Sequence, residues 1–309
     1  MQEDQQNTVS PLIYGGQAVI EGVMMKSPAG KMAIACRLPS GEIVVEEMQG
    51  RSPASLPGVV RLPVFRGIYN FIEALTSGVA MINLSAKLSM QGEEEEETLS
   101  NAQMLLAVAL AMLLSVGLFI ILPTVLFRFL PLEVITGEST IARNLLESAI
   151  RLLLFTGYIL LISQIKDIRR VFEYHGAEHK TIYCYEAGRE LTPENAAGFK
   201  SLHPRCGTSF LLIVMVVSSL FFSLFGWPNL WVRILYRLGL LPLVAGVSYE
   251  ILRLLGRFQG HNSLVDLLIW PGLQMQRLTT REPDTSQLEV AIVALQRVLE
   301  GDSSSCSIN

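Results

Sequence analysis

Two long stretches of this chain contain no charged side chain. They cover 98–127 and 206–232, and both are dominated by leucine, valine, isoleucine and phenylalanine. A bilayer core about 30 Å thick requires roughly 20 apolar residues in a helix. The pattern therefore predicts membrane-spanning helices at about 104–127 and 209–226.

Two further apolar stretches each contain ionisable residues. Glu147 and Arg151 are four residues apart, so they can pair on one face of a helix. Glu250 lies near one end of the other stretch, where a long side chain can reach the polar interface or form a site at membrane depth. These stretches predict spans at about 145–165 and 238–255, which makes four spans in all.

The residues before the first span alternate apolar runs with turn residues. The runs 32–38 and 42–47 flank a short loop with a proline and a glycine, which is typical of a β-hairpin. Glu21, within the apolar run 17–25, is expected on the polar face of an edge strand. Val64–Leu88 repeats its apolar residues at helical spacing and predicts an amphipathic helix.

The residues after the last span contain two apolar segments. Leu264–Met275 is too short to cross a bilayer and includes Asp266 and Pro271, so we expect it to be re-entrant or interfacial. Pro283–Glu300 has one apolar stripe and predicts a helix that docks on another element.

These patterns predict an α+β protein, in which a polytopic α-helical membrane bundle of about four spans carries a small N-terminal β-rich cytoplasmic domain and a C-terminal amphipathic helix. The expected organisation is a disordered tail (1–12), the β-rich domain with its amphipathic helix (13–92), the bundle (98–257) with a cytoplasmic loop (166–207), an interfacial segment and helix (258–300) and a tail (301–309).

Composition supports a membrane protein. The chain is 50% hydrophobic and 17% charged with net charge −4, and its mean hydropathy is +0.41, whereas an average soluble domain is about 25% charged. These values argue against a soluble enzyme, a disordered chain and a nucleic-acid binder. Lysine and arginine gather in loop 166–207, which predicts that this loop and both termini face the cytoplasm from the inner (plasma) membrane.

One cluster of residues carries the chemistry. His175-Gly176-Ala177-Glu178-His179 matches the pattern H-x-x-E-H. On a helix, His175 and His179 face the same way and can both bind one zinc ion, while Glu178 can serve as general base. The alternative is that the histidines are interfacial and that Glu178 pairs with a nearby basic residue.

A catalytic zinc ion takes three protein ligands and keeps one position open. His203 is the first choice for the third ligand and Cys206 the second, with Glu186 as a further option. His261 follows the fourth span and is expected at the interface. Alternatively, the loop around Cys206 only shapes the turn into the next helix.

Four strings of the sequence resemble the YqhQ-like family. These are bacterial and plastid-lineage membrane proteins with a domain of unknown function, often described as predicted metal-dependent enzymes. The resemblance covers roughly Ile13 to Leu299 and implies a polytopic membrane protein with a metal site at His175, Glu178 and His179, extended by His203 and Cys206. It implies no particular reaction. The strings are Gly15–Met25, Tyr174–Thr181, Leu202–Phe210 and Gln276–Pro283.

Two functions are consistent with these residues. The first is a zinc-dependent hydrolase that acts at the cytoplasmic membrane surface on a peptide or lipid-linked bond. The alternative is a non-catalytic membrane scaffold or assembly factor, in which a structural metal fastens loop 166–207. The expected partners are the lipid bilayer and a membrane-protein or lipid-linked substrate, with no nucleic acid and with the oligomeric state left open.

Overall fold

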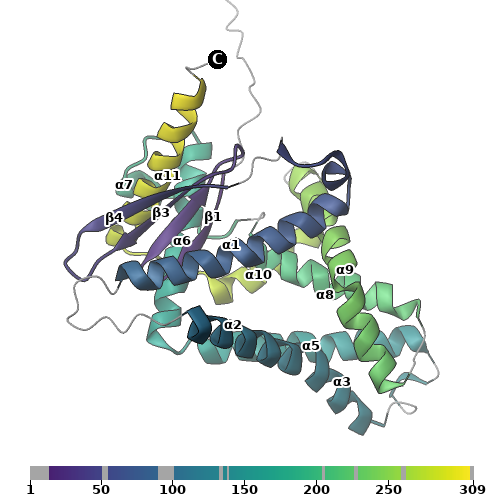
Figure 1. Cartoon of the computed structure of the whole chain (residues 1–309). Helices are drawn as coiled ribbons and strands as arrows, with labels where there is room; N and C mark the ends of the chain where they lie inside the picture. Colours follow the sequence, from purple (N-terminus) through teal and green to yellow (C-terminus); the bar gives the residue numbers. More distant parts are fainter. Residues whose placement is uncertain are drawn as a thin grey trace, which may run out of the picture.

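The computed structural model describes residues 14–50, 55–89, 101–131, 135–137, 139–203, 206–225, 229–258 and 262–306. Figure 1 shows a small β-sheet with helices on both faces, and a group of apolar helices on one side of it. The predicted tail 1–12 and His261 lie outside the described residues.

The N-terminal residues form one antiparallel sheet in the order β1-β2-β3-β4, which confirms the predicted β-rich region. The predicted hairpin is β3–β4. Glu21 is not on the face of an edge strand, because the chain reverses at Ile20-Glu21 between β1 and β2, and Glu21 has a positive φ of 51° there. The strands are β1 (Gly15–Val19), β2 (Gly22–Lys26), β3 (Lys31–Arg37) and β4 (Ile43–Gln49).

Helices cover both faces of this sheet (Figure 1). Alternate strand residues such as Val23 and Met25 pack with α6 (Lys166–Glu186), α7 (Pro193–Ala197) and α11 (Thr285–Cys306). The other face, which includes Met24 and Ile34, packs against α1 (Phe65–Ser89), the predicted amphipathic helix; the short helix η2 (Gly58–Arg61) precedes it. The sheet is thus the middle layer of three.

Helix α11 confirms the predicted docking helix. Its apolar stripe is buried against the sheet and α6. It does not end at Glu300, as predicted, but continues to Cys306. Two contacts hold this last part, since Lys31 donates to the carbonyl of Gly301 and the Tyr14 hydroxyl donates to Asp302.

Three helical segments are long and apolar enough to cross a membrane: Leu105–Leu126, Thr140–Ile162 and Leu230–Phe258. They correspond to three of the four predicted spans. The other predicted span is a shorter apolar helix of 17 residues. The elements of this region are α2 (Asn101–Val116), the π-helical turn η3 (Gly117–Ile121), α3 (Leu122–Leu126), η4 (Phe127–Phe129), α5 (Thr140–Ile162), α8 (Gly207–Ser223), α9 (Leu230–Phe258) and α10 (Ser263–Thr279).

A group of buried charges joins the apolar helices. Glu147 of α5 forms a two-pronged ion pair with Arg237 of α9, and Arg151 lies 3.7 Å away from the same carboxylate. The predicted pairing of Glu147 with Arg151 is therefore present, but Arg237 is the closer partner. A buried ion needs a partner of opposite charge, and Glu147 supplies one for Arg237. Arg237 can therefore lie inside α9, which begins at Leu230 and not near 238 as predicted.

Helices α1 and α9 connect the sheet to the apolar helices. Gly67 and Gly246 let the two backbones approach, because a Cβ at Gly67 would lie 2.6 Å from the carbonyl oxygen of Gly246. Arg66 forms a bidentate ion pair with Glu250 at the same crossing. Glu250 is therefore held by a residue of α1. This crossing places the α1 side of the sheet next to the apolar helices.

Candidate metal centre

Helix α6 positions both histidines of the H-x-x-E-H pattern. Tyr174, Ala177 and Ile182 are buried in the core beneath the sheet, which fixes the rotation of the helix. His175 and His179 then project from a neighbouring stripe, one turn apart, with ring centroids separated by 4.5 Å. The predicted helical geometry of the motif is present.

The third member of the group comes from the loop before α8. The Sγ atom of Cys206 lies 3.2 Å from Nε2 of His175, and one ligand atom from each of His175, His179 and Cys206 lies within 4.8 Å of the others. Nitrogen and sulfur ligands on tetrahedral zinc are about 3.5 Å apart. These three residues, called the ligand cluster below, therefore fit a zinc ion after small side-chain movements.

Backbone carbonyls orient both imidazoles. Nδ1 of His175 is 2.8 Å from the carbonyl oxygen of Thr279, and Nδ1 of His179 is 2.5 Å from that of Ser201. A carbonyl oxygen can only accept, so each Nδ1 carries the hydrogen and each neutral ring keeps its Nε2 lone pair available. Metal-binding histidines are commonly held by a hydrogen bond of this kind.

His203 lies beside the ligand cluster rather than within it. Gln276 holds its backbone from both sides, accepting from the N–H at 2.8 Å and donating to the carbonyl at 2.6 Å. Its ring packs on Tyr183, and its Nε2 lies 3.8 Å from Glu186. The structure thus places Cys206 closest to His175, and it places Glu186 next to His203.

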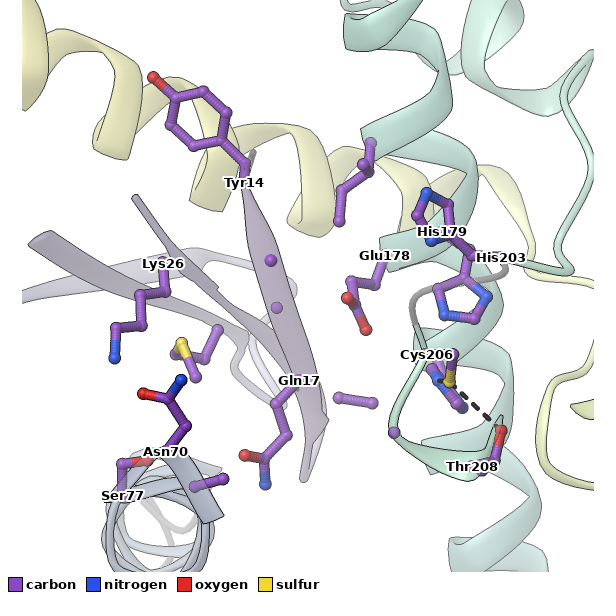
Figure 2. Close-up of a pocket in the computed structure, with 18 of the residues that line it drawn as sticks. Tyr14, Gln17, Lys26, Asn70, Ser77, Glu178, His179, His203, Cys206 and Thr208 are labelled. Carbon is purple, nitrogen blue, oxygen red and sulfur yellow. Dashed lines mark hydrogen bonds between the residues drawn. The ribbon is translucent and has the colours of Figure 1, made fainter. Parts of the chain in front are cut away.

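Glu178 lies between α6 and strand β1 (Figure 2). It is 5% exposed. Burial raises the pKa of its carboxyl group to about 7, against the opposing effects of His175 and of the Gly16 N–H, which donates to the carboxylate. Only glycine fits at position 16, because a Cβ there would lie 2.9 Å from Cγ of Glu178 and 2.7 Å from the carbonyl oxygen of Met24.

Gly176, inside the motif, allows the segment after α10 to approach α6 closely. The N–H of Arg281 donates to the carbonyl of Phe172 at 2.9 Å. A Cβ on Gly176 would lie only 2.0 Å from the carbonyl oxygen of Arg281. This approach brings the Thr279 carbonyl to His175. Sequence reasoning missed Thr279, Gln276 and Ser201, although the string from Gln276 to Pro283 already signalled that this segment matters.

The ligand cluster opens into a cavity of about 770 Å³. The cavity, called the central cavity below, extends from the histidines past strand β1 to α1, and Figure 2 shows Glu178 on one side of β1 and Asn70 and Ser77 on the other. Cys206 lines it as well, with Sγ 3.3 Å from the Thr208 hydroxyl. A molecule in this cavity reaches both Glu178 and the ligand cluster.

The fold and the site define a protein with helices of membrane-spanning length and a histidine–cysteine cluster in which His179 and Cys206 are buried. The chain belongs to the family described as protein of unknown function DUF1385, whose family model matches residues 62–301. The uncharacterized protein YqhQ of Bacillus subtilis (strain 168) is 36% identical over 301 residues, which cover 94% of this chain and 93% of that protein. The YqhQ-like resemblance is thereby confirmed. No solved structure matches the chain.

Proposed function

We propose that this protein is a metal-dependent hydrolase that acts at a membrane surface. His175, His179 and Cys206 are the proposed metal ligands, and Glu178 is the proposed general base. The observation that carries the proposal is the pair of Nδ1–carbonyl contacts, because they leave the Nε2 atom of each imidazole able to bind a metal, in a group whose ligand atoms lie within 4.8 Å of one another and include the Cys206 thiol.

Zinc is the proposed metal, since two imidazoles and a thiolate suit it better than magnesium or calcium. When bound, zinc supplies a Lewis acid and a water molecule that ionises near neutral pH. Glu178 lines the same cavity as the ligand cluster, and there it would hold the proton of an attacking water. The Gly16 N–H donates to its carboxylate, and both residues line the central cavity.

The location of the cluster supports action at a membrane surface. Cys206 directly precedes α8, an apolar helix, and α8 packs against α5 and α9, two of the helices long enough to span a bilayer. A residue at the end of such a helix lies near the polar boundary of the membrane. We further propose that the sheet and both termini face the cytoplasm from the plasma membrane, in line with the lysines and arginines of 166–207.

Metal analysis of the purified full chain in detergent tests the proposal. We expect about one zinc per chain in the wild type and loss of most of it in His175→Ala and His179→Ala. Gly157→Ala is a matched control, because a Cβ there has open space around it and lies outside the site. Wild-type protein that is folded and free of metal after growth with zinc would contradict the proposal.

Glu178→Gln separates catalysis from a structural metal. We expect it to retain zinc and to lose hydrolysis of peptide and ester probes by at least a hundredfold, since general acid–base groups contribute about 10²–10⁴ in rate. If the variant keeps both metal and full activity, Glu178 is not the base. If the metal-loaded wild type hydrolyses no probe, the metal fastens 166–207 as part of a scaffold.

A further inference from the structure

We propose that the substrate is an extended peptide segment that pairs with strand β1 as an added strand. This inference rests on the proposed hydrolase function and names the class of its substrate. An extended peptide commonly binds a protein by adding to the exposed edge of a sheet, where the backbone supplies the affinity. Strand β1 is an edge strand, since β2 is its one neighbour within the sheet.

The register shows which groups of β1 point outwards. The N–H of Ser27 donates to Lys31 and the N–H of Arg37 donates to Glu21, so odd-numbered residues of β2 bond to β3. Hydrogen bonding alternates along an antiparallel strand, so even-numbered residues of β2 bond to β1. Their partners are Gly15, Gln17 and Val19. The backbone groups of Gly16 and Ala18 therefore point away from β2.

Contacts cover both ends of this outward edge, and its middle has no partner among the residues that the structure describes. Ser85 of α1 accepts from the N–H of Ile20 just after β1, and Glu178 accepts from the N–H of Gly16. The Gly16 carbonyl and the Ala18 N–H and carbonyl lie between these two contacts. Both residues line the central cavity, so a peptide in the cavity can bond to this part of the edge.

The same edge leads to the ligand cluster. Glu178 contacts β1 through Gly16 and belongs to the same helix turn as His175 and His179. Figure 2 shows Glu178 between β1 and the histidines. A strand that pairs with Ala18 and continues past Gly16 thus brings a backbone carbonyl next to the general base.

The charges around the central cavity favour a peptide over a phosphate-bearing lipid. Lys26 is the one lysine or arginine among the described lining residues, and it forms an ion pair with Glu73. A lipid phosphate would require cations to neutralise it. Gln17, Asn70 and Ser77 instead offer neutral amide and hydroxyl groups, which suit the alternating donors and acceptors of a peptide backbone.

The proposed step is peptide-bond hydrolysis. Glu178 removes a proton from water, the water oxygen bonds to the peptide carbonyl carbon, and the carbon–nitrogen bond breaks. Glu178 then returns the proton to the leaving amine nitrogen. One water is consumed and a carboxylic acid and an amine are formed; the acid then passes its proton to the amine, which gives a carboxylate and an ammonium group, and nothing is oxidised or reduced.

The test uses zinc-loaded full chain in detergent micelles and a randomised decapeptide library, with cleavage followed by mass spectrometry. Ala18→Pro removes an outward N–H without removing a bond of the β1–β2 ladder, a position where edge strands tolerate proline. The matched control is Glu47→Pro on the other edge strand. Its N–H also points outwards, because even-numbered residues of β4 bond to β3.

We expect Ala18→Pro to reduce cleavage by about three- to tenfold, the effect of one hydrogen bond, at unchanged zinc content, and Glu47→Pro to match the wild type. The second measurement needs no variant: methylation of single amide nitrogens in a cleaved peptide should impair cleavage at every second residue. Cleavage insensitive to both changes overturns the inference. So does hydrolysis of an ester probe without cleavage of any peptide, although the proposed hydrolase then stands. A metal-free protein overturns both.

Discussion

Replacing Gly176 by alanine tests how the segment after α10 supports the site. In an unobstructed helix this change stabilises by about 0.8–1.0 kcal/mol. Here the new Cβ would lie 2.0 Å from the carbonyl oxygen of Arg281, so that segment must move by more than 1 Å, about the gap to ordinary contact. Overpacking costs about 1–3 kcal/mol, and the hydrogen bond from Arg281 to Phe172 contributes about 1 kcal/mol more.

The balance is a net destabilisation of about 1–3 kcal/mol, measured as a lower Tm of the purified protein in detergent. The Thr279 carbonyl would also leave His175, so we expect zinc affinity to fall about 10- to 100-fold. Gly157→Ala in α5 is the control, since nothing lies within 4 Å of the added Cβ. If Gly176→Ala is as stable as this control and binds zinc as tightly as the wild type, the described contact is wrong.

Two further predictions concern buried groups away from the site. Glu147→Leu leaves Arg237 without its carboxylate and should destabilise the protein by about 3–5 kcal/mol. The double variant Glu147→Leu with Arg237→Leu should recover much of that loss. A Tm series of the two variants checks this, and equal losses in both would refute it. Burial raises the pKa of Cys36 to about 12, so about one thiol in 10⁴ is ionised at pH 8. Alkylation followed by mass spectrometry should therefore label Cys36 only after unfolding or at much higher pH. Rapid labelling of the folded protein at pH 8 would contradict its burial.

Periodic patterns predicted most of the elements that pack on a single face. The β3–β4 hairpin, α1 and α11 follow directly from alternation and helical spacing, because each buries one side against the same sheet. The end of α11 was not predictable in this way. Its last turns depend on Lys31 and Tyr14, which are remote in sequence.

Long-range pairing explains the differences in the apolar region. The last span was predicted to begin near 238, but Arg237 is buried with Glu147, which lies 90 positions earlier in the chain, and α9 extends through both Arg233 and Arg237. Hydropathy scores each residue by itself. It therefore excludes a charged residue from a helix interior even when the fold supplies its partner.

In the candidate site, too, a local pattern predicts some residues, while others depend on contacts between distant parts of the chain. The H-x-x-E-H pattern predicted the positions of His175 and His179 because both lie on one helix. The order of preference between His203 and Cys206 depended on which side chain turns towards α6. Gln276 bonds to the His203 backbone from both sides, and no local pattern in the loop reveals that contact.

X-ray absorption at the zinc edge of the purified full chain tests the central claim most directly. The account predicts one zinc per chain with one sulfur ligand at about 2.3 Å and two imidazole nitrogens at about 2.0 Å, and the sulfur contribution should disappear in Cys206→Ser. A folded protein without zinc, or a zinc ion bound only by oxygen and nitrogen atoms in the wild type, would contradict it.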